Sequence, residues 1–221
     1  MSLIIGILGR PKNDDREFAS FSKAVSDVII SFGYIPLGII APVINPNQLM
    51  TDDNIKKLHK AIDLCDGFIL QGGSDYYQYD IEAIKYIYDK KMPLLGICLG
   101  MQTMGVVYGA TLISVPNHNR LGVDYVHPVS IEEGSKLHGI TETNRILVNS
   151  RHNDMIINPS DIKVVGINDG VIEAIEKEDV PFFLGVQWHP EDMLSYDKAS
   201  RKIFEALFLA CQKYHNKAKT K

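Results

Sequence analysis

Cys98 lies in a segment whose glycine spacing is typical of a catalytic nucleophile. The segment Gly96-Ile-Cys98-Leu-Gly100 follows an apolar run and precedes a helical pattern. Glycines two residues before and after a nucleophile permit the sharp strand-to-helix turn that raises its side chain above a sheet. The start of a helix also favours the thiolate form of cysteine. The sequence therefore predicts nucleophilic catalysis by Cys98, and a buried structural cysteine is the alternative.

A histidine and a glutamate follow a later apolar run, in the segment Trp188-His189-Pro190-Glu191. A cysteine nucleophile needs a base that takes its proton and later protonates the leaving amine. Residues two apart in an extended segment point the same way, so His189 and Glu191 are predicted to face one site. The carboxylate would then hold the imidazole in the required tautomer. The alternative is a surface histidine beside an acid at a strand end.

Two adjacent glycines, Gly72 and Gly73, end a third apolar run. Backbone N–H groups at such a turn can face inward and stabilise a developing oxyanion. The predicted pair of donors is the N–H of Gly73 and the N–H of Leu99, directly after the nucleophile. An ordinary turn explains the two glycines equally well.

The other cysteines and several histidines have no comparable surroundings and are expected to be structural. No cluster of histidine, cysteine and aspartate shows the spacing of metal ligands, so no metal site is predicted. The residues expected to be structural are Cys65, Cys211, His59, His127, His138 and His215.

The first half of the chain alternates short apolar runs with helical patterns. Strands are expected at residues 3–8, 35–40, 66–71 and 93–98, and helices at 18–32, 52–64 and 81–90. Thr51 is the expected N-cap of the second helix. Strands that are apolar almost throughout predict a parallel sheet covered by helices on both faces.

The second half changes to closely spaced strands. They are expected at residues 110–115, 123–131, 145–149, 162–168, 171–175 and 182–186. The turn Asn168-Asp-Gly170 predicts a hairpin between two of them, and residues 197–214 form an amphipathic helix that closes the chain. Since the sequence contains no repeat or linker, residues 1–221 are predicted to be a single domain.

Composition limits the classes of function. A hydrophobic content of 45% in 221 residues predicts a globular fold, and a net charge of −4 argues against nucleic acid as a partner. No apolar run is long enough to span a membrane. The three cysteines form no disulfide framework, which favours a reducing, cytoplasmic location.

The order of these motifs resembles the class I glutamine amidotransferase-like superfamily. A Gly-Gly loop is followed by Gly-x-Cys-x-Gly-x-Gln and then by His-Pro-Glu. Residues 148–152, 169–176 and 184–191 are similar to the γ-glutamyl-γ-aminobutyrate hydrolase and γ-glutamyl hydrolase branch. The resemblance implies a flavodoxin-like α/β fold with a mostly parallel sheet, a Cys98-His189-Glu191 triad, and no metal or organic cofactor.

The function implied by this resemblance is hydrolysis of the γ-glutamyl amide bond of a small molecule. A γ-glutamyl thioester would form on Cys98, and glutamate and an amine would be released. The alternative is a glutaminase subunit that supplies ammonia to a synthetase partner. A third possibility is a binding module without catalytic activity. The chain could also form a homodimer. The substrate contacts implied by the family motifs are Gly72, Gln102, Ser150, Arg151 and His152.

Three loops differ from the family pattern or leave alternatives open. Members of that branch carry a long insertion after the Gly-Gly loop. In this chain residues 74–79 run almost directly into a helix instead. The resemblance therefore does not imply that aminobutyrate is the leaving amine here. The tyrosines of residues 74–79 either line this pocket or form an exposed loop. Residues 10–17 have two possible roles. Arg10 or Arg16 could pair with an anionic leaving group. Alternatively, the segment begins a solvated helix. Residues 116–120 either fold over the site or form a hairpin tip.

Overall fold

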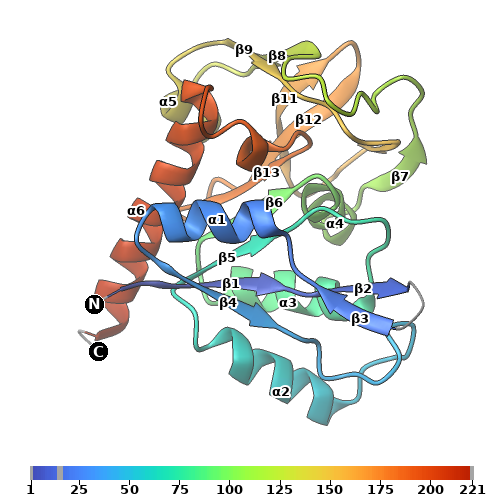
Figure 1. Cartoon of the computed structure of the whole chain (residues 1–221), viewed down its shortest axis with the longest axis vertical. Coiled ribbons are helices and arrows are strands. Elements are labelled where there is room, and N and C mark those ends of the chain that lie inside the picture. The colour runs from blue at the N-terminus through green and yellow to red at the C-terminus, as the bar shows by residue number, and fades with distance from the viewer. Residues whose placement is uncertain (1, 14–16, 220–221) are drawn as a thin grey trace.

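A nine-stranded sheet is the centre of the fold in the computed structural model, which describes residues 2–13 and 17–219 (Figure 1). The strand order is β4-β1-β5-β6-β13-β12-β11-β8-β9. The first five are parallel: β4 (Ile35–Ile39), β1 (Ile4–Leu8), β5 (Gly67–Leu70), β6 (Leu94–Ile97) and β13 (Phe183–Val186). The other four extend the sheet as antiparallel neighbours: β12 (Val171–Glu176), β11 (Lys163–Asn168), β8 (His127–Ile131) and β9 (Arg145–Val148).

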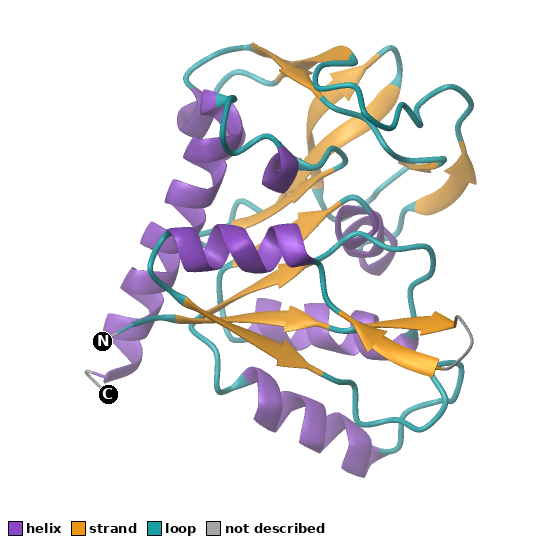
Figure 2. Ribbon diagram, viewed as in Figure 1, coloured by secondary structure: helices purple, strands orange, loops and turns teal. Residues whose placement is uncertain are grey.

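Helices cover both faces of this sheet (Figure 2), which confirms the predicted α/β architecture. The pleat sends successive apolar side chains to opposite faces, so Leu94 and Phe183 join one core while Leu95 and Leu184 join the other. One core is completed by α1 (Lys23–Ser31), α5 (Lys136–Thr141) and α6 (Lys198–Lys219). The other is completed by α2 (Asp52–Ile62), α3 (Gln78–Asp89) and α4 (Leu99–Val107).

Local signals explain where several elements begin and turn. Thr51 is the N-cap of α2, where its side chain accepts from the Asn54 N–H and the Asn54 side chain accepts from the Thr51 N–H. At the predicted hairpin between β11 and β12, Asp169 and Gly170 both have positive φ, at 43° and 83°. A turn with two positive φ angles matches the twist of the strands, so the sequence located this hairpin correctly.

The loop after β1 was predicted wrongly. Residues expected to begin a solvated helix form an antiparallel pair instead, β2 (Arg10–Asn13) and β3 (Glu17–Ser20). Helix α1 starts only after Ser22, whose side chain accepts from the Val25 N–H. Pro11 lies in β2 opposite Ala19, and both strands also contact distant residues: Arg10 pairs with Asp80, and the Ser20 carbonyl accepts from Gln71. Arg16 lies outside the described residues.

Two further elements were missed in the second half. The strand predicted at 110–115 is β7 (Thr111–Ser114), which pairs with β10 (Asp154–Ile157) in a separate two-stranded sheet. Strand β10 was not predicted from the sequence. The short helix α5, whose N-cap is Ser135, was not predicted either. Among the described residues, no helix carries an apolar stretch long enough to cross a bilayer.

The parallel strands place the predicted site residues at one edge of the sheet. Strands β1, β5, β6 and β13 are neighbours and run in the same direction. Their carboxyl ends are followed by Gly9 and Arg10, by Gln71 to Gly73, by Cys98, and by Gln187 to His189. This edge is where open α/β sheets bind their ligands.

Candidate active site

Cys98 occupies a strained turn between β6 and α4. Its backbone has φ 51° and ψ −106°, a conformation that a residue with a side chain rarely adopts. A Cβ at Gly96 would lie 2.8 Å from the carbonyl carbon of Gly100, and one at Gly100 would lie 2.2 Å from the Leu70 oxygen. The flanking glycines are therefore required by close backbone approach, as the sequence analysis expected for a nucleophile elbow.

Replacing Gly100 with alanine will destabilise the fold. The added methyl group would meet the Leu70 backbone, which cannot move without separating α4 from β5. Overpacking of this kind lowers the free energy of unfolding by about 2–3 kcal/mol. Denaturant unfolding measures the loss. Gly139→Ala in α5 is the matched control, because open space surrounds its Cβ position, and it should change stability by less than about 1 kcal/mol.

His189 and Glu191 lie beside Cys98. The Nδ1 atom of His189 is 2.8 Å from Oε1 of Glu191, and the Cys98 side chain is one of the groups that raise the pKa of the imidazole. Since Nδ1 faces the carboxylate, Nε2 is the nitrogen left for the sulfur. The structure thus brings together the three residues that the sequence predicted as a triad.

The charge state of His189 follows from these neighbours. Burial lowers the pKa of His189, but the Glu191 carboxylate and the contact with Cys98 raise it by more, so the pKa lies well above 6.5. A protonated imidazole beside a cysteine stabilises the thiolate. The surroundings therefore keep the imidazole protonated up to a higher pH than that of an ordinary histidine.

Asn149 holds the backbone of His189, and the sequence analysis did not identify it. The His189 N–H donates to Asn149 Oδ1 at 2.8 Å, and Asn149 Nδ2 donates to the His189 carbonyl at 2.9 Å. Asn149 is fully buried at the end of β9. Both polar groups of one amide thus fix the position of the histidine, through a contact that spans 40 residues of sequence.

The two glycines after β5 border the nucleophile. A Cβ at Gly72 would lie 3.7 Å from the Cβ of Cys98 and 3.0 Å from Cε1 of His189. A Cβ at Gly73 would lie 3.0 Å from Cδ2 of Leu99. The N–H of Leu99 is in the first turn of α4, where backbone donors lack helical acceptors. The two predicted oxyanion donors therefore belong to adjacent residues across the elbow.

Gln71 fixes this glycine turn and was also missed from sequence. Its Nε2 donates to the carbonyl oxygens of Leu8 at 2.8 Å and Ser20 at 3.0 Å, while its Oε1 accepts from the Ser22 N–H. The side chain thereby ties the ends of β1, β3 and β5 together. Its place directly before two glycines at a strand end is the signal that could have identified it.

A cavity of about 470 Å³ adjoins the glycine turn. The Arg10 guanidinium lies on its wall, 2.7 Å from Oδ1 of Asp80, and both side chains are almost fully buried. Burial raises the pKa of Asp80, and Arg10 opposes that shift. The charge of Arg10 is therefore already paired within the protein. Of the three tyrosines in residues 74–79, Tyr77 lines this cavity, and its ring stacks on that of Tyr79, which is buried in the first turn of α3, with centroids 5.3 Å apart.

Four of the substrate contacts implied by the family motifs have partners inside the protein. Gln102 donates to the Asp154 carbonyl at 2.9 Å and to Gln187 Oε1 at 3.1 Å. The other three form internal contacts as well: Ser150 with the His118 carbonyl, Arg151 with Asp192, and His152 with the Asp154 carbonyl. These contacts position the residues beside the site, and direct contact with substrate stays a prediction.

Residues 116–120 lie against the end of β9 rather than forming an isolated tip. Arg120 N–H donates to the Ser150 carbonyl at 2.9 Å, and Asn119 forms a bridge with Arg151. The segment therefore covers residues 150–151, next to the asparagine that holds His189.

The other two cysteines have surroundings of a different kind. Burial raises the pKa of Cys65 to about 12, with the Asp66 carboxylate acting in the same direction. Burial likewise raises the pKa of Cys211, which lies in α6. Neither thiol ionises readily near neutral pH, so neither has the properties of a nucleophile.

Comparisons with known proteins identify relatives of this chain. The profile of the peptidase C26 family matches residues 77–191, which is 115 of 221 residues and includes Cys98, His189 and Glu191. Glutamine amidotransferase-like protein YvdE of Lactococcus lactis subsp. lactis (strain IL1403) is 27% identical over 241 aligned residues, covering 91% of this chain and 96% of that protein.

Two further relatives have named activities. Gamma-glutamyl-gamma-aminobutyrate hydrolase PuuD of Escherichia coli (strain K12) is 31% identical over a match that covers 56% of each chain. CTP synthase of Thermotoga maritima is 29% identical over 70% of this chain, which spans only 37% of that enzyme. Among solved structures, the glutaminase domain of Trypanosoma brucei CTP synthase has a TM-score of 0.70 at 18% identity and covers 96% of this chain and 94% of that one, which shows the same fold.

Proposed function

This chain belongs to the peptidase C26 family, and from that membership and the surroundings of Cys98 we propose that it cleaves the γ-glutamyl amide bond of a small molecule. The observation that carries the proposal is one arrangement: Cys98 on a strained elbow, His189 beside it, and Glu191 2.8 Å from Nδ1 of the imidazole. The relative PuuD is named for hydrolysis of a γ-glutamyl amide, which supports this class of substrate.

The proposed first step forms a thioester. The Cys98 thiolate attacks the amide carbonyl carbon, and the C–N bond breaks as protonated His189 gives its proton to the leaving amine. The carbonyl oxygen carries negative charge during the attack. We assign the stabilisation of this charge to the N–H groups of Gly73 and Leu99, whose residues are neighbours at the elbow.

The second step releases glutamate. His189, now neutral, takes a proton from water, and the resulting hydroxide attacks the thioester carbonyl and displaces the Cys98 thiolate. Glu191 stabilises the imidazolium that forms again, and Asn149 keeps the histidine backbone in place. The cycle needs no group beyond water and the side chains of the chain itself.

The amine half of the substrate fits the cavity beside the glycine turn. That cavity has a volume of about 470 Å³ and is lined by Arg10, Tyr77 and the residues after β5. Because Asp80 already neutralises Arg10, the wall offers a paired charge and an aromatic ring rather than a free cation. We therefore expect a polar amine group and no strong requirement for an anion.

The second candidate function is that of a glutaminase that passes ammonia to a synthetase. The similarity to CTP synthases favours it, since the same fold serves there as one part of a larger enzyme. Under this alternative a partner synthase would control the reaction, and the isolated chain would be nearly inactive towards glutamine.

Kinetics of the isolated protein separate the two functions. We expect kcat/KM for at least one member of a panel of γ-glutamyl amines to exceed that for glutamine by about tenfold or more, which corresponds to about 1.4 kcal/mol of transition-state binding. Release of glutamate is measured, because hydrolysis of a γ-glutamyl amine and hydrolysis of glutamine both produce glutamate and one assay can therefore compare them. If the isolated chain hydrolyses none of the amides and glutamine turnover appears only with a synthetase present, the alternative is correct.

A further inference from the structure

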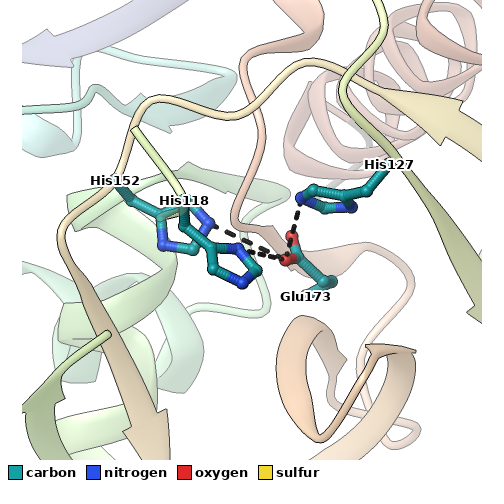
Figure 3. Close-up of side chains that lie close together, drawn as sticks. All are labelled: His118, His127, His152 and Glu173. Carbon is teal, nitrogen blue, oxygen red and sulfur yellow. Dashed lines mark ion pairs between the residues drawn. The ribbon is translucent and has the colours of Figure 1, made fainter. Parts of the chain in front are cut away.

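Three histidines and a glutamate meet in the antiparallel half of the sheet. His127 begins β8 and Glu173 lies within β12, whereas His118 and His152 come from the segments before β8 and before β10. Figure 3 shows His118 and His152 approaching the carboxylate together and His127 approaching it from another direction. One ligand atom from each residue lies within 4.8 Å of all the others.

The atoms that face each other in this cluster have no hydrogen-bond partners. Nδ1 of His118, Nε2 of His127, Nε2 of His152 and both carboxylate oxygens of Glu173 are buried and unpaired. The side chains of Glu173 and His152 are each only 1% exposed. A buried carboxylate without a partner is costly, and unpaired polar groups in a core call for a physical explanation.

Ion pairing between these side chains does not supply that explanation. The three nitrogen-to-oxygen distances to Oε1 of Glu173 are 3.5 Å from His127, 3.7 Å from His152 and 3.8 Å from His118, all longer than a hydrogen bond. Protonating one histidine would leave the other two nitrogens unpaired. Protonating all three would place like charges against one another.

Backbone carbonyls orient the outer nitrogens of two of these rings. Nδ1 of His152 donates to the Asp154 carbonyl at 3.0 Å, and Nδ1 of His127 faces the Pro128 carbonyl at 3.4 Å. A carbonyl only accepts, so the hydrogen is on Nδ1 and a neutral ring presents a lone pair on Nε2. Both lone pairs then point at a carboxylate, an arrangement that a bound cation makes favourable. Such carbonyl contacts are typical of metal-binding histidines.

We propose that His118, His127, His152 and Glu173 bind one divalent transition-metal ion, with Zn²⁺ as the first candidate. Four ligands at about 2.1 Å from a tetrahedral zinc ion lie about 3.4 Å apart, close to the three measured separations from Glu173. Three imidazoles and one carboxylate suit zinc and its neighbours better than Mg²⁺ or Ca²⁺. Because the protein supplies all four ligands, the site is structural.

The metal joins segments that also support the active-site histidine. His152 follows Asn149 by three residues, and Asn149 binds the His189 backbone on both sides. His118 is tied to the same stretch, because its carbonyl accepts from Ser150. A metal ion would therefore fix residues 149–152 against the sheet. This inference does not depend on the proposed reaction, since ligand binding is measured without substrate.

The proposed site differs from the expectation, based on the sequence, that the chain binds no metal and that His127 is only structural. That expectation rested on ligand spacing along the sequence, which is informative when ligands share a loop or a helix. Here the four ligands come from four separate segments, at positions 118, 127, 152 and 173. Their convergence depends on the pairing of β8, β11 and β12.

Titration of the metal-depleted protein with Zn²⁺ tests the proposal. We expect one high-affinity ion per chain, and a rise in the thermal unfolding midpoint with added zinc. His127→Ala and Glu173→Gln should each lower the affinity by at least about tenfold and abolish the rise in midpoint. His118→Ala is a third variant, on a loop where folding is at little risk.

Two controls distinguish this site from other histidines. His138→Ala removes a histidine of α5 that lies outside the cluster and should leave zinc binding unchanged. His189→Ala removes one member of the second group with ligand atoms within 4.8 Å of one another, which also contains Glu191 and Asp192. That variant should keep its zinc.

The visible spectrum of the Co²⁺-substituted protein provides an independent readout. We expect ligand-field bands of tetrahedral cobalt in the wild-type protein and in His138→Ala, and their loss in His127→Ala. Sub-stoichiometric zinc, or equal affinity in wild type, His127→Ala and Glu173→Gln, would overturn the proposal. Loss of zinc in His189→Ala but not in His127→Ala would do so as well, by placing the ion in the active site.

Discussion

Cys98→Ala will abolish hydrolysis of γ-glutamyl amides while leaving the protein folded. Alanine removes the sulfur that attacks the substrate in the proposed reaction, and without a nucleophile no thioester forms. Removing the nucleophile of a comparable hydrolase costs about 10⁴- to 10⁶-fold in kcat. Glutamate release under saturating substrate measures the loss, and denaturant unfolding checks the fold. The alanine methyl occupies the position of the cysteine Cβ, so the elbow itself is preserved.

The matched control is Cys65→Ala. Cys65 is buried, and its high pKa excludes it as a nucleophile at neutral pH. We expect full activity, with a modest loss of stability from the missing sulfur. Activity that survives in Cys98→Ala, or disappears in Cys65→Ala, would falsify the assignment of the nucleophile.

His189→Ala has the second-largest expected effect. The variant lacks both the base that keeps Cys98 ionised and the acid that protonates the leaving amine, so both halves of the cycle fail. A loss of about 10⁴- to 10⁶-fold in kcat is expected, similar to that of the nucleophile because the two act as a unit. Single-turnover kinetics measure it directly. Retention of more than about a hundredth of the activity would contradict the proposed role.

Glu191→Gln is the informative comparison for His189. Glu191 acts through the imidazole, so its loss should be roughly 10- to 100-fold less severe than loss of the histidine. The carboxylate raises the pKa of His189, and its removal lowers that pKa. The ion pair with the thiolate needs a protonated imidazole, so the alkaline limb of the kcat/KM profile should move to lower pH. A purely structural role for Glu191 would reduce activity without moving that limb.

The residues predicted to do chemistry have local signals. Gly96 and Gly100 reveal the elbow, since both must lack a side chain for β6 and α4 to meet. His189 and Glu191 are two residues apart, and a short extended segment is enough to direct both to one side. The helix cap at Thr51 and the turn at Gly170 are local in the same sense, and both were located correctly.

Residues that hold those groups in place were not found from sequence. Asn149 and His189 are 40 positions apart, and Gln71 reaches back 63 positions to Leu8. Each contact exists because β1, β5, β13 and β9 take particular places in one sheet. The hydrophobic pattern predicts that a strand is buried, but it does not predict which strand is its neighbour.

The distance along the chain between interacting residues explains why some features were predictable and others were not. Patterns within a few residues predicted the α/β architecture and pointed to Cys98, His189 and Glu191 as the residues that do chemistry. Tertiary contacts brought together the buried pair of Arg10 with Asp80 and the cluster of His118, His127, His152 and Glu173. A polar side chain far along the chain gains its partner only when the sheet assembles, since burial creates both the contact and the cost of leaving it unmade.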